Sequence, residues 1–256
     1  MNDFNGNVQI IGIKRIPMIK VDDDLGNIIK ESAEKQSTPV SDGDIIVVTQ
    51  KIVSKAEGRI IRLKDVQPST FAKSVSKITG KEPELIELIL GESRSIVRLI
   101  GPHLITETKH GWVCANAGID KSNVSGGDSV TLLPVNPDHS ADRIRKRIES
   151  LTGKKVAVIV TDTFGRPLRE GHVDVAIGVS GIDPILDMRG EKDIFGFVLK
   201  VKETAIADEL ASAAELVIGN AKEQIPVAII RGYKYPFSDT ARARKLIRPK
   251  AKDLFI

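Results

Sequence analysis

The 256-residue sequence has few of the features that mark secreted or membrane proteins. Cys114 is its only cysteine, which excludes an internal disulfide framework, and no Cys and His spacing resembles a zinc site. No apolar run approaches the roughly 20 residues that span a bilayer. The first eight residues lack the basic start and apolar core of a signal peptide. We therefore expect a cytoplasmic protein with no membrane partner.

Aromatic residues are also scarce, at 4% of the chain, so a surface that stacks the bases of single-stranded nucleic acid is hard to assemble. The 38 Lys and Arg residues against 34 Asp and Glu residues give a formal charge of +4, which suits small anionic substrates. We interpret the basic C-terminal residues as a solvated tail rather than an RNA-binding module. They are Arg242, Arg244, Lys245, Arg248, Lys250 and Lys252. We expect no nucleic-acid partner.

The common nucleotide-binding loops are missing. The chain contains no G-x-x-x-x-G-K-[ST] loop and no G-x-G-x-x-G after a strand. A nucleotide would therefore have to be bound by elements dispersed along the chain.

The residues that are present are typical of a soluble globular enzyme, with 41% hydrophobic and 28% charged. Apolar runs predict strands at 8–13, 45–48, 94–100, 104–108, 129–133, 156–160, 174–180 and 227–230. Helical spacing predicts helices at 25–33, 68–78, 83–90, 140–151 and 204–218. The alternation of predicted strands and helices is typical of an α/β protein, and the sequence has no internal repeats or long linkers. We expect a single domain over residues 1–256, with room for two subdomains.

Three details of these helices are specific expectations. Asp22, Asp23 and Asp24 supply caps for the first helix, and Ser140 is expected to cap the fourth. The helix at 68–78 is expected to begin at its proline and to present Phe71, Val75 and Ile78 as its apolar residues. The caps predict where each helix begins, and the position of its first residue determines which face packs on its neighbours.

Two short acidic segments each follow an apolar stretch. Val156 to Arg166 reads V-A-V-I-V-T-D-T-F-G-R, which places Asp162 at the carboxyl end of a buried strand, where open α/β sheets bind ligands. Asp120 lies in the turn N-A-G-I-D-K-S-N. Either aspartate alone could merely close a turn. Together they favour a site for one or two hard divalent cations, which are usually held by one or two carboxylates and substrate phosphates.

Polar and cationic residues also follow the strand at 45–48. Gln50, Lys51, Ser54 and Lys55 could hold a phosphate there, with Lys55 as a point charge. Alternatively, Lys51 and Lys55 lie on the solvated side of a helical turn, and because lysines are mostly exposed this interpretation is favoured for the segment taken alone.

Two further features are open between structural interpretations. Gly178 and Gly181 mark either a bulge or a close backbone approach. Asp187 and Arg189 are expected to pair with each other rather than to bind a ligand.

Four segments in order resemble the coenzyme F420-0:L-glutamate ligase (gamma-glutamyl ligase) family. They are I-P-M-I at 16–19, V-S-K-A-E-G at 53–58, N-A-G-I-D-K-S-N at 116–123 and T-D-T-F-G-R at 161–166. The likeness continues through 174–178, 202–219 and 226–232, so it covers nearly the whole chain. Four ordered motifs are far more specific than any one of them.

The resemblance implies a GTP-dependent ligase that adds L-glutamate to coenzyme F420-0 and then further γ-linked glutamate. It also implies Mg²⁺ or Mn²⁺, with two divalent ions, stimulation by K⁺, and a homodimer. The implied fold is α+β, with unusual mixed or antiparallel sheets and packed helices, and not a doubly wound sheet. Strand alternation is the only support for that fold that is independent of the resemblance.

The resemblance also assigns residues to roles. Metal ligands of the family match Asp120, Asp162 and Thr163. The implied catalytic residues are Lys55, Asp120 and Asp162. The matched nucleotide-binding positions are Ile16, Pro17, Met18, Ile19, Gln50, Lys51, Lys55, Asn123, Gly219, Asn220, Ala221, Lys222, Glu223 and Gln224. Two positions depart from the family pattern, because Phe164 stands where some relatives carry Asn and the loop 219–224 lacks extra glycines.

The implied chemistry requires activation of a carboxylate, which we expect to occur as an acyl phosphate made from the γ-phosphoryl group of GTP. Metal ions on Asp120 and Asp162, together with Lys55, would neutralise charge during this transfer. His110, His172 and Asp174 are candidates for a general base, and Arg166 and Arg169 for substrate anions. The alternatives are a related ligase with a different acidic acceptor and a non-catalytic nucleotide- or metal-binding regulator.

Overall fold

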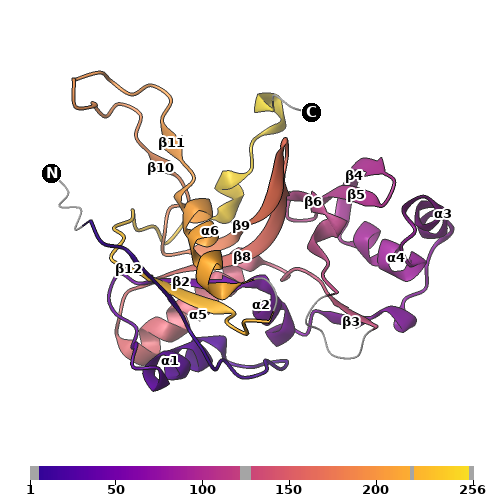
Figure 1. The fold of residues 1–256 in the computed structure, drawn as a ribbon, viewed down its shortest axis with the longest axis horizontal. Coiled ribbons are helices and arrows are strands. Elements are labelled where there is room, and N and C mark those ends of the chain that lie inside the picture. Colours follow the sequence, from indigo (N-terminus) through magenta and orange to yellow (C-terminus); the bar gives the residue numbers. More distant parts are fainter. Residues whose placement is uncertain (1–5, 122–127, 220–221, 254–256) are drawn as a thin grey trace.

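A five-stranded mixed sheet forms the centre of the molecule. The computed structural model describes residues 6–121, 128–219 and 222–253. The sheet order is β1 (Gln9–Gly12), β12 (Val227–Arg231), β2 (Ile45–Thr49), β8 (Ala157–Arg166) and β9 (Arg169–Ser180). β2 and β8 are parallel, whereas the other neighbouring pairs are antiparallel. One parallel pair excludes a doubly wound sheet, and the mixture of helices and sheets agrees with the expected α+β class (Figure 1).

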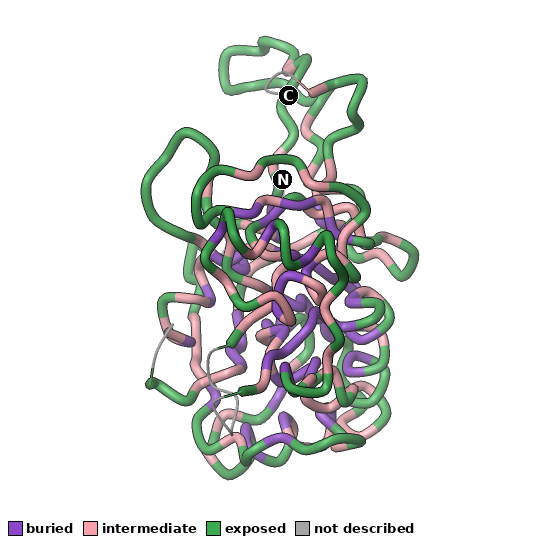
Figure 2. Tube along the Cα trace, turned by 90° about the vertical axis from the view of Figure 1, so that its right-hand side faces the viewer, coloured by how far each residue is buried: buried purple, intermediate pink, exposed green. Residues whose placement is uncertain are grey.

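Helices cover both faces of this sheet. Alternate residues such as Val48 and Val160 face α1 (Leu25–Lys35) and α5 (Pro137–Thr152). Their neighbours, such as Val47 and Ile159, face α6 (Ile206–Ile218). The strands therefore read as continuous apolar runs, because both of their faces are buried. Figure 2 shows the buried segments gathered in the body of the molecule.

The capping residues of two helices test the expectations from sequence. Asp24 caps α1, because its side chain accepts a hydrogen bond from the Asn27 amide at 3.0 Å. The prediction that Ser140 is a cap was wrong. Asn136 accepts from the His139 amide and Pro137 follows at the first helical position, so α5 begins one turn earlier. Ser140 lies inside the helix, where its hydroxyl donates to the Asn136 carbonyl.

A second group of elements packs beside α2 (Gln50–Ala56) around its own apolar core (Figure 1). β3 (Ile60–Arg62) pairs with β7 (Ser129–Thr131), and β4 (Ser93–Ile100), β5 (His103–Thr108) and β6 (Val113–Ala115) form a three-stranded sheet. The other elements of this group are η1 (Leu63–Asp65), α3 (Thr70–Thr79), α4 (Pro83–Gly91) and η2 (Asn116–Gly118). These elements thus share an apolar core of their own, and the expectation of one domain with room for two subdomains stays a prediction.

The expectation for α3 was partly wrong. The helix begins at Thr70, two residues after Pro68, because Ser69 caps it by accepting from the Ala72 amide. Phe71 and Ile78 are 58% and 57% exposed, whereas Val75 is buried. α3 packs on α4 through a narrow stripe of smaller residues, so its larger apolar residues fall outside the contact.

β8 and β9 are longer than expected and form one hairpin. Their pairing runs from Val158–Ser180 to Arg166–Arg169. Asp162 therefore lies within a strand, and the prediction that its strand ends in a turn there was wrong. Gly178 lies both beside a bulge and at a close backbone approach, the two interpretations offered for it. The register shifts beside it, and a Cβ at this position would lie 2.4 Å from the Pro137 carbonyl oxygen.

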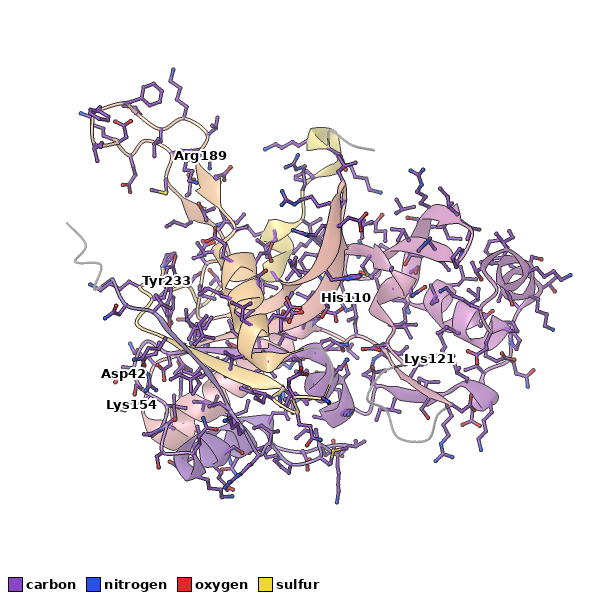
Figure 3. The ribbon with its side chains drawn as sticks, viewed as in Figure 1. Asp42, His110, Lys121, Lys154, Arg189 and Tyr233 are labelled. Carbon is purple, nitrogen blue, oxygen red and sulfur yellow. The ribbon has the colours of Figure 1, made fainter. Side chains whose placement is uncertain are left out.

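An arm projects from the body between β9 and α6. Its base is a short ladder of β10 (Leu186–Asp187) and β11 (Glu203–Thr204) (Figure 1). Arg189, labelled in Figure 3, donates through Nε to Asp187 at 2.8 Å, which confirms the expected pair. The C-terminal segment contains η3 (Ala243–Leu246) and η4 (Lys250–Lys252). Among the described residues, none of the helices is long and apolar enough to cross a membrane.

Candidate functional site

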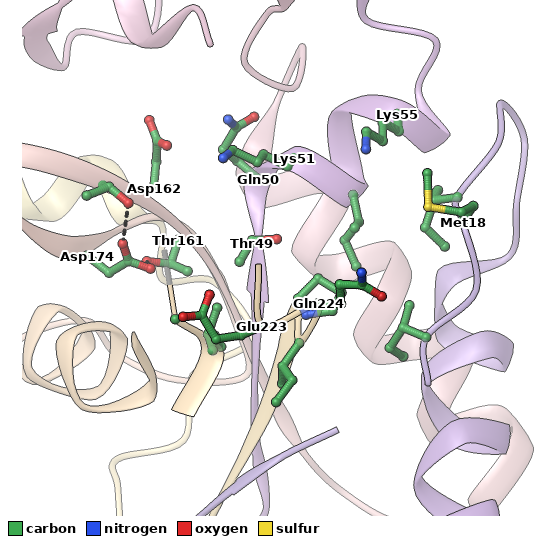
Figure 4. A pocket seen from close by; sticks show the side chains of 18 of the residues that line it. Met18, Thr49, Gln50, Lys51, Lys55, Thr161, Asp162, Asp174, Glu223 and Gln224 are labelled. Carbon is green, nitrogen blue, oxygen red and sulfur yellow. Dashed lines mark hydrogen bonds between the residues drawn. The ribbon is translucent and has the colours of Figure 1, made fainter. Parts of the chain in front are cut away.

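A cavity of about 470 Å³ opens at one end of the central sheet. It lies where β2 turns into α2 and where the chain leaves α6 for β12 (Figure 4). The lining residues come from five segments. They are Ile16, Pro17, Met18, Ile19, Thr49, Gln50, Lys51, Ile52, Lys55, Thr161, Asp162, Thr163, Asp174, Ile218, Gly219, Glu223, Gln224, Ile225 and Pro226.

The cavity forms at this place because two paired strands differ in length. Pairing between β2 and β8 ends at Thr49 and Thr161, where the chain turns into α2. β8 continues with β9 alone, so Asp162 and Thr163 lie where β2 has left the edge of β8. The polar residues that follow each apolar run therefore meet at one end of the sheet.

One side of the cavity carries cationic and amide groups. Burial, followed by the neighbouring Lys51 charge, lowers the pKa of Lys55. Gln50 is 1% exposed, and its Oε1 accepts a hydrogen bond from the Ser54 hydroxyl at 2.9 Å. Its Nε2 is buried and has no hydrogen-bond partner among the described residues. A buried amide donor that lines a cavity can be satisfied by a polar ligand.

The opposite side carries carboxylates. Burial raises the pKa of Asp162 to about 7, and the charges of Asp174 and Asp120 contribute to this shift. Burial also raises the pKa of Asp174, against the effect of a hydrogen bond from Thr163. Figure 4 shows Asp162 and Asp174 together, across the cavity from Lys55 and Met18. The cavity is therefore polarised, with anionic and cationic sides.

The carboxylates fit a divalent cation. Lys51 Nζ lies 2.8 Å from Asp120 Oδ2, and its charge partly offsets the rise in the pKa of Asp162 and Asp174. The cluster thus already attracts a cationic group. In the described ranges, no three His, Cys, Asp or Glu residues group as metal ligands. Mg²⁺ and Mn²⁺ need only one or two carboxylates when phosphates and water complete the shell, so two aspartates and the Thr163 hydroxyl are a sufficient protein set.

Most of the residues assigned from sequence come together. The cavity is lined by Ile16, Pro17, Met18, Ile19, Gln50, Lys51, Lys55, Asp162, Thr163, Gly219, Glu223 and Gln224. Asp120 adjoins it through the ion pair with Lys51. Lys222 is not among the lining residues. Asn123, Asn220 and Ala221 lie outside the described residues. The solvated interpretation of Lys51 and Lys55 was wrong, because α2 turns both toward the cavity.

Other candidates lie elsewhere. His110 Nε2 is 3.1 Å from the Val135 carbonyl, and His172 pairs with Gly165 near the end of the β8–β9 hairpin. Arg166 donates to the Glu170 carbonyl within that hairpin, close to Arg169. None of these four is among the cavity-lining residues. Asp174, the third candidate base, does line the cavity.

Sequence reasoning missed Thr49, Thr161 and the apolar wall of Ile218, Ile225 and Pro226. Thr161 flanks the aspartate in the T-D-T motif, and this pattern could have singled it out. The apolar wall carries no chemical signal, because Ile and Pro residues are common at the end of a helix and in the loop before a strand.

Comparisons with known proteins cover nearly the whole chain. The family described as F420-0:Gamma-glutamyl ligase matches residues 12–232. A protein of Methanocaldococcus jannaschii named Coenzyme F420:L-glutamate ligase is 49% identical over 248 residues, covering 97% of this chain and 96% of its own. A protein of the same name from Methanothermobacter thermautotrophicus is 45% identical over 249 residues, covering 97% and 98%. The matched region contains every cavity-lining residue, and the chain belongs to the F420-0:Gamma-glutamyl ligase family.

Proposed function

We propose that this protein joins L-glutamate to coenzyme F420-0, with GTP as co-substrate, and then adds further γ-linked glutamate. Family membership over residues 12–232 supports the glutamate ligation. The observation that carries the nucleotide and metal parts is the polarised cavity, where Lys51 and Lys55 face Asp162 and Asp174. Phosphoryl transfer depends mostly on positioning and charge neutralisation, for which such a cavity is suited.

The proposed reaction has two steps. The carboxylate of the acceptor takes the γ-phosphoryl group of GTP, giving an acyl phosphate and GDP. The amine of glutamate then attacks the acyl carbon, a C–N bond forms, the C–O bond to phosphate breaks, and the amine loses a proton. Activation is needed because a carboxylate and an amine do not condense directly in water.

The chain's own residues divide these tasks. Lys51 and Lys55 offset the negative charge of the nucleotide phosphates, and Gln50 Nε2 donates a hydrogen bond to the ligand. The I-P-M-I segment supplies an apolar wall for the guanine base. Met18, 77% exposed, lies at the cavity edge, where nucleotide binding would cover it.

Asp120, Asp162 and Thr163 would hold Mg²⁺ or Mn²⁺. Bound there, two such ions would neutralise the charge of the transferring phosphoryl group, with K⁺ as a further activator. We also propose that the protein acts as a homodimer in the cytoplasm.

Mass spectrometry of the products tests this function. Purified protein is incubated with GTP, Mn²⁺, L-glutamate and glutamate-free F420-0, beside Asp120→Asn and Asp162→Asn variants. We expect a glutamyl mass increment from the native protein that both variants lose. Asp65→Asn, which changes an exposed carboxylate in η1, is the matched control and should retain activity.

The alternatives give different results. A glutamyl or other aminoacyl increment on a different acidic acceptor would replace F420-0 as the substrate. GTP binding without phosphate release or any product would indicate a regulator instead of a ligase.

A further inference from the structure

Asp174 makes an unusual set of contacts for a residue that lines a substrate cavity. It is 3% exposed and lies on β9 directly opposite Thr163 of β8. Paired residues of antiparallel strands project to the same face, so the two side chains meet. Thr163 Oγ1 donates to Asp174 Oδ1 at 2.7 Å, and Thr161 Oγ1 lies 3.1 Å from Asp174 Oδ2.

The backbone of Asp174 is held as firmly as its side chain. Its amide donates to Glu215 Oε2 at 2.9 Å, and its carbonyl accepts from the Ser212 hydroxyl at 2.8 Å. Both partners belong to α6, whose last residue, Ile218, also lines the cavity. The carboxylate therefore has a fixed position between the two threonines.

The direction of the hydrogen bond to Thr163 has a chemical consequence. A threonine hydroxyl has one proton and two lone pairs. Because the proton is given to Asp174, the oxygen can act only as an acceptor or a ligand toward anything else. The Thr161 hydroxyl has a second acceptor within reach, because it also lies 3.0 Å from the Val175 carbonyl oxygen.

We propose that Asp174 is a positioning residue that fixes the Thr163 hydroxyl with its proton turned away, so that its oxygen serves as a ligand for one of the divalent cations. This inference rests on the proposed function, because it assumes the cation site at Asp120, Asp162 and Thr163. Outer partners that orient metal ligands commonly change metal affinity by about 10- to 100-fold when they are removed.

Direct Mn²⁺ binding to the nucleotide-free protein, followed by the electron paramagnetic resonance signal of free Mn²⁺, tests the proposal. Asp174→Ala removes the acceptor and should weaken binding at least about tenfold. Asp174→Asn can still accept from Thr163 through its carbonyl, while its NH₂ donates to Thr161. A positioning role therefore predicts rescue in the Asn variant, to within about threefold of native affinity.

A role for the negative charge of Asp174 gives the opposite result. In that case Asp174→Asn would weaken Mn²⁺ binding as much as Asp174→Ala, and the proposal would be overturned.

A double-mutant cycle supplies a second readout that does not depend on the Asn variant. Thr163→Val should weaken Mn²⁺ binding about tenfold, whereas Thr163→Ser, which keeps the hydroxyl, should not. If Asp174 acts through Thr163, adding Asp174→Ala to Thr163→Val produces no further loss. Additive losses would overturn the proposal, and if Asp174→Ala does not fold, Asp174→Leu, which also lacks the acceptor but keeps a side chain of similar size, takes its place in the cycle.

Two controls separate this inference from the function on which it rests. Asp208→Asn neutralises a half-buried carboxylate on α6, which accepts from the Ala176 amide of β9 at 2.9 Å, and should leave Mn²⁺ affinity unchanged. Asp162→Asn should abolish Mn²⁺ binding. Native binding that survives Asp162→Asn, or no native binding, refutes the cation site itself. Loss in Asp162→Asn with no effect of Asp174→Ala refutes only the role of Asp174.

Discussion

Two buried charged clusters in this protein differ in how completely their groups are paired. Arg145 of α5 has a side chain that is 6% exposed and surrounded by acceptors. Its Nε donates to Ser180 at 2.9 Å, Nη1 to Glu149 at 3.2 Å and Nη2 to Asp239 at 2.7 Å. Although burial opposes its charge, Glu149 and Asp239 raise the pKa of Arg145. This cluster ties the C-terminal segment to α5.

The cavity cluster leaves comparable groups less satisfied. Burial raises the pKa of Asp162 to about 7, and Gln50 Nε2 has no partner among the described residues. A fully paired buried charge stabilises one conformation, whereas an incompletely paired one lowers its free energy by binding a ligand. We infer that the Arg145 cluster is structural and that the cavity cluster serves function. The predictions below test this distinction.

Asp162→Asn should have the largest effect on activity and little effect on folding. We expect the ligation rate to fall about 1000-fold, because charge neutralisation at the phosphoryl group is lost. Steady-state kinetics and a thermal melt measure the two properties. A large loss of melting temperature in this variant would place Asp162 with the structural residues.

Arg145→Met should do the reverse. We expect the free energy of unfolding to fall by about 3 kcal/mol, because the acidic partners lose a buried cation. The rate per folded molecule should stay near that of the native protein. Denaturant unfolding measures the stability change, and Arg143→Met, at an exposed position of the same helix, is the control. Loss of ligase activity in a folded Arg145→Met protein would contradict the distinction.

The pH dependence of stability should differ between native protein and Asp162→Asn. Folding raises the pKa of Asp162 from 3.8 to about 7, so between these values the folded state keeps a proton that the unfolded state has lost. Stability then falls as pH rises through this window. In the absence of metal, the melting temperature of Asp162→Asn relative to native should rise from about pH 4 to pH 7 and stay level above it.

A melting-temperature difference that stays constant across this range would show that Asp162 has an ordinary pKa. Added Mn²⁺ should stabilise the native protein more at pH 8 than at pH 6, because the ion competes with the proton for the carboxylate.

Gln50→Met should have the smallest of these effects. It removes a buried donor that has no partner among the described residues, but it also removes the acceptor of the Ser54 hydroxyl. Because these two effects on stability oppose each other, the melting temperature should stay close to that of the native protein. GTP affinity should fall about fivefold, the size expected for one lost hydrogen bond. Isothermal titration with GTP measures this, and Gln67→Met, at an exposed position, is the control. Unchanged GTP affinity would show that Gln50 Nε2 does not contact the nucleotide.

Much of the secondary structure was predictable, because local pattern determines it. The apolar runs at 45–48 and 227–230 appear as β2 and β12, and Asp24 caps α1 as expected. Errors arose where a longer-range partner decided the outcome. β8 continues past Asp162 because β9 pairs with it up to Arg166, and a sequence pattern does not show that pairing.

The sequence by itself determined the family, the candidate metal and nucleotide residues and most of the strands and helices, because each depends on short motifs or local periodicity. Only the tertiary structure decided that Lys51 and Lys55 face a cavity, that Lys51 pairs with Asp120, and that Asp174 accepts from Thr163. These contacts join residues far apart in the chain, and their positions follow from where paired strands of unequal length end.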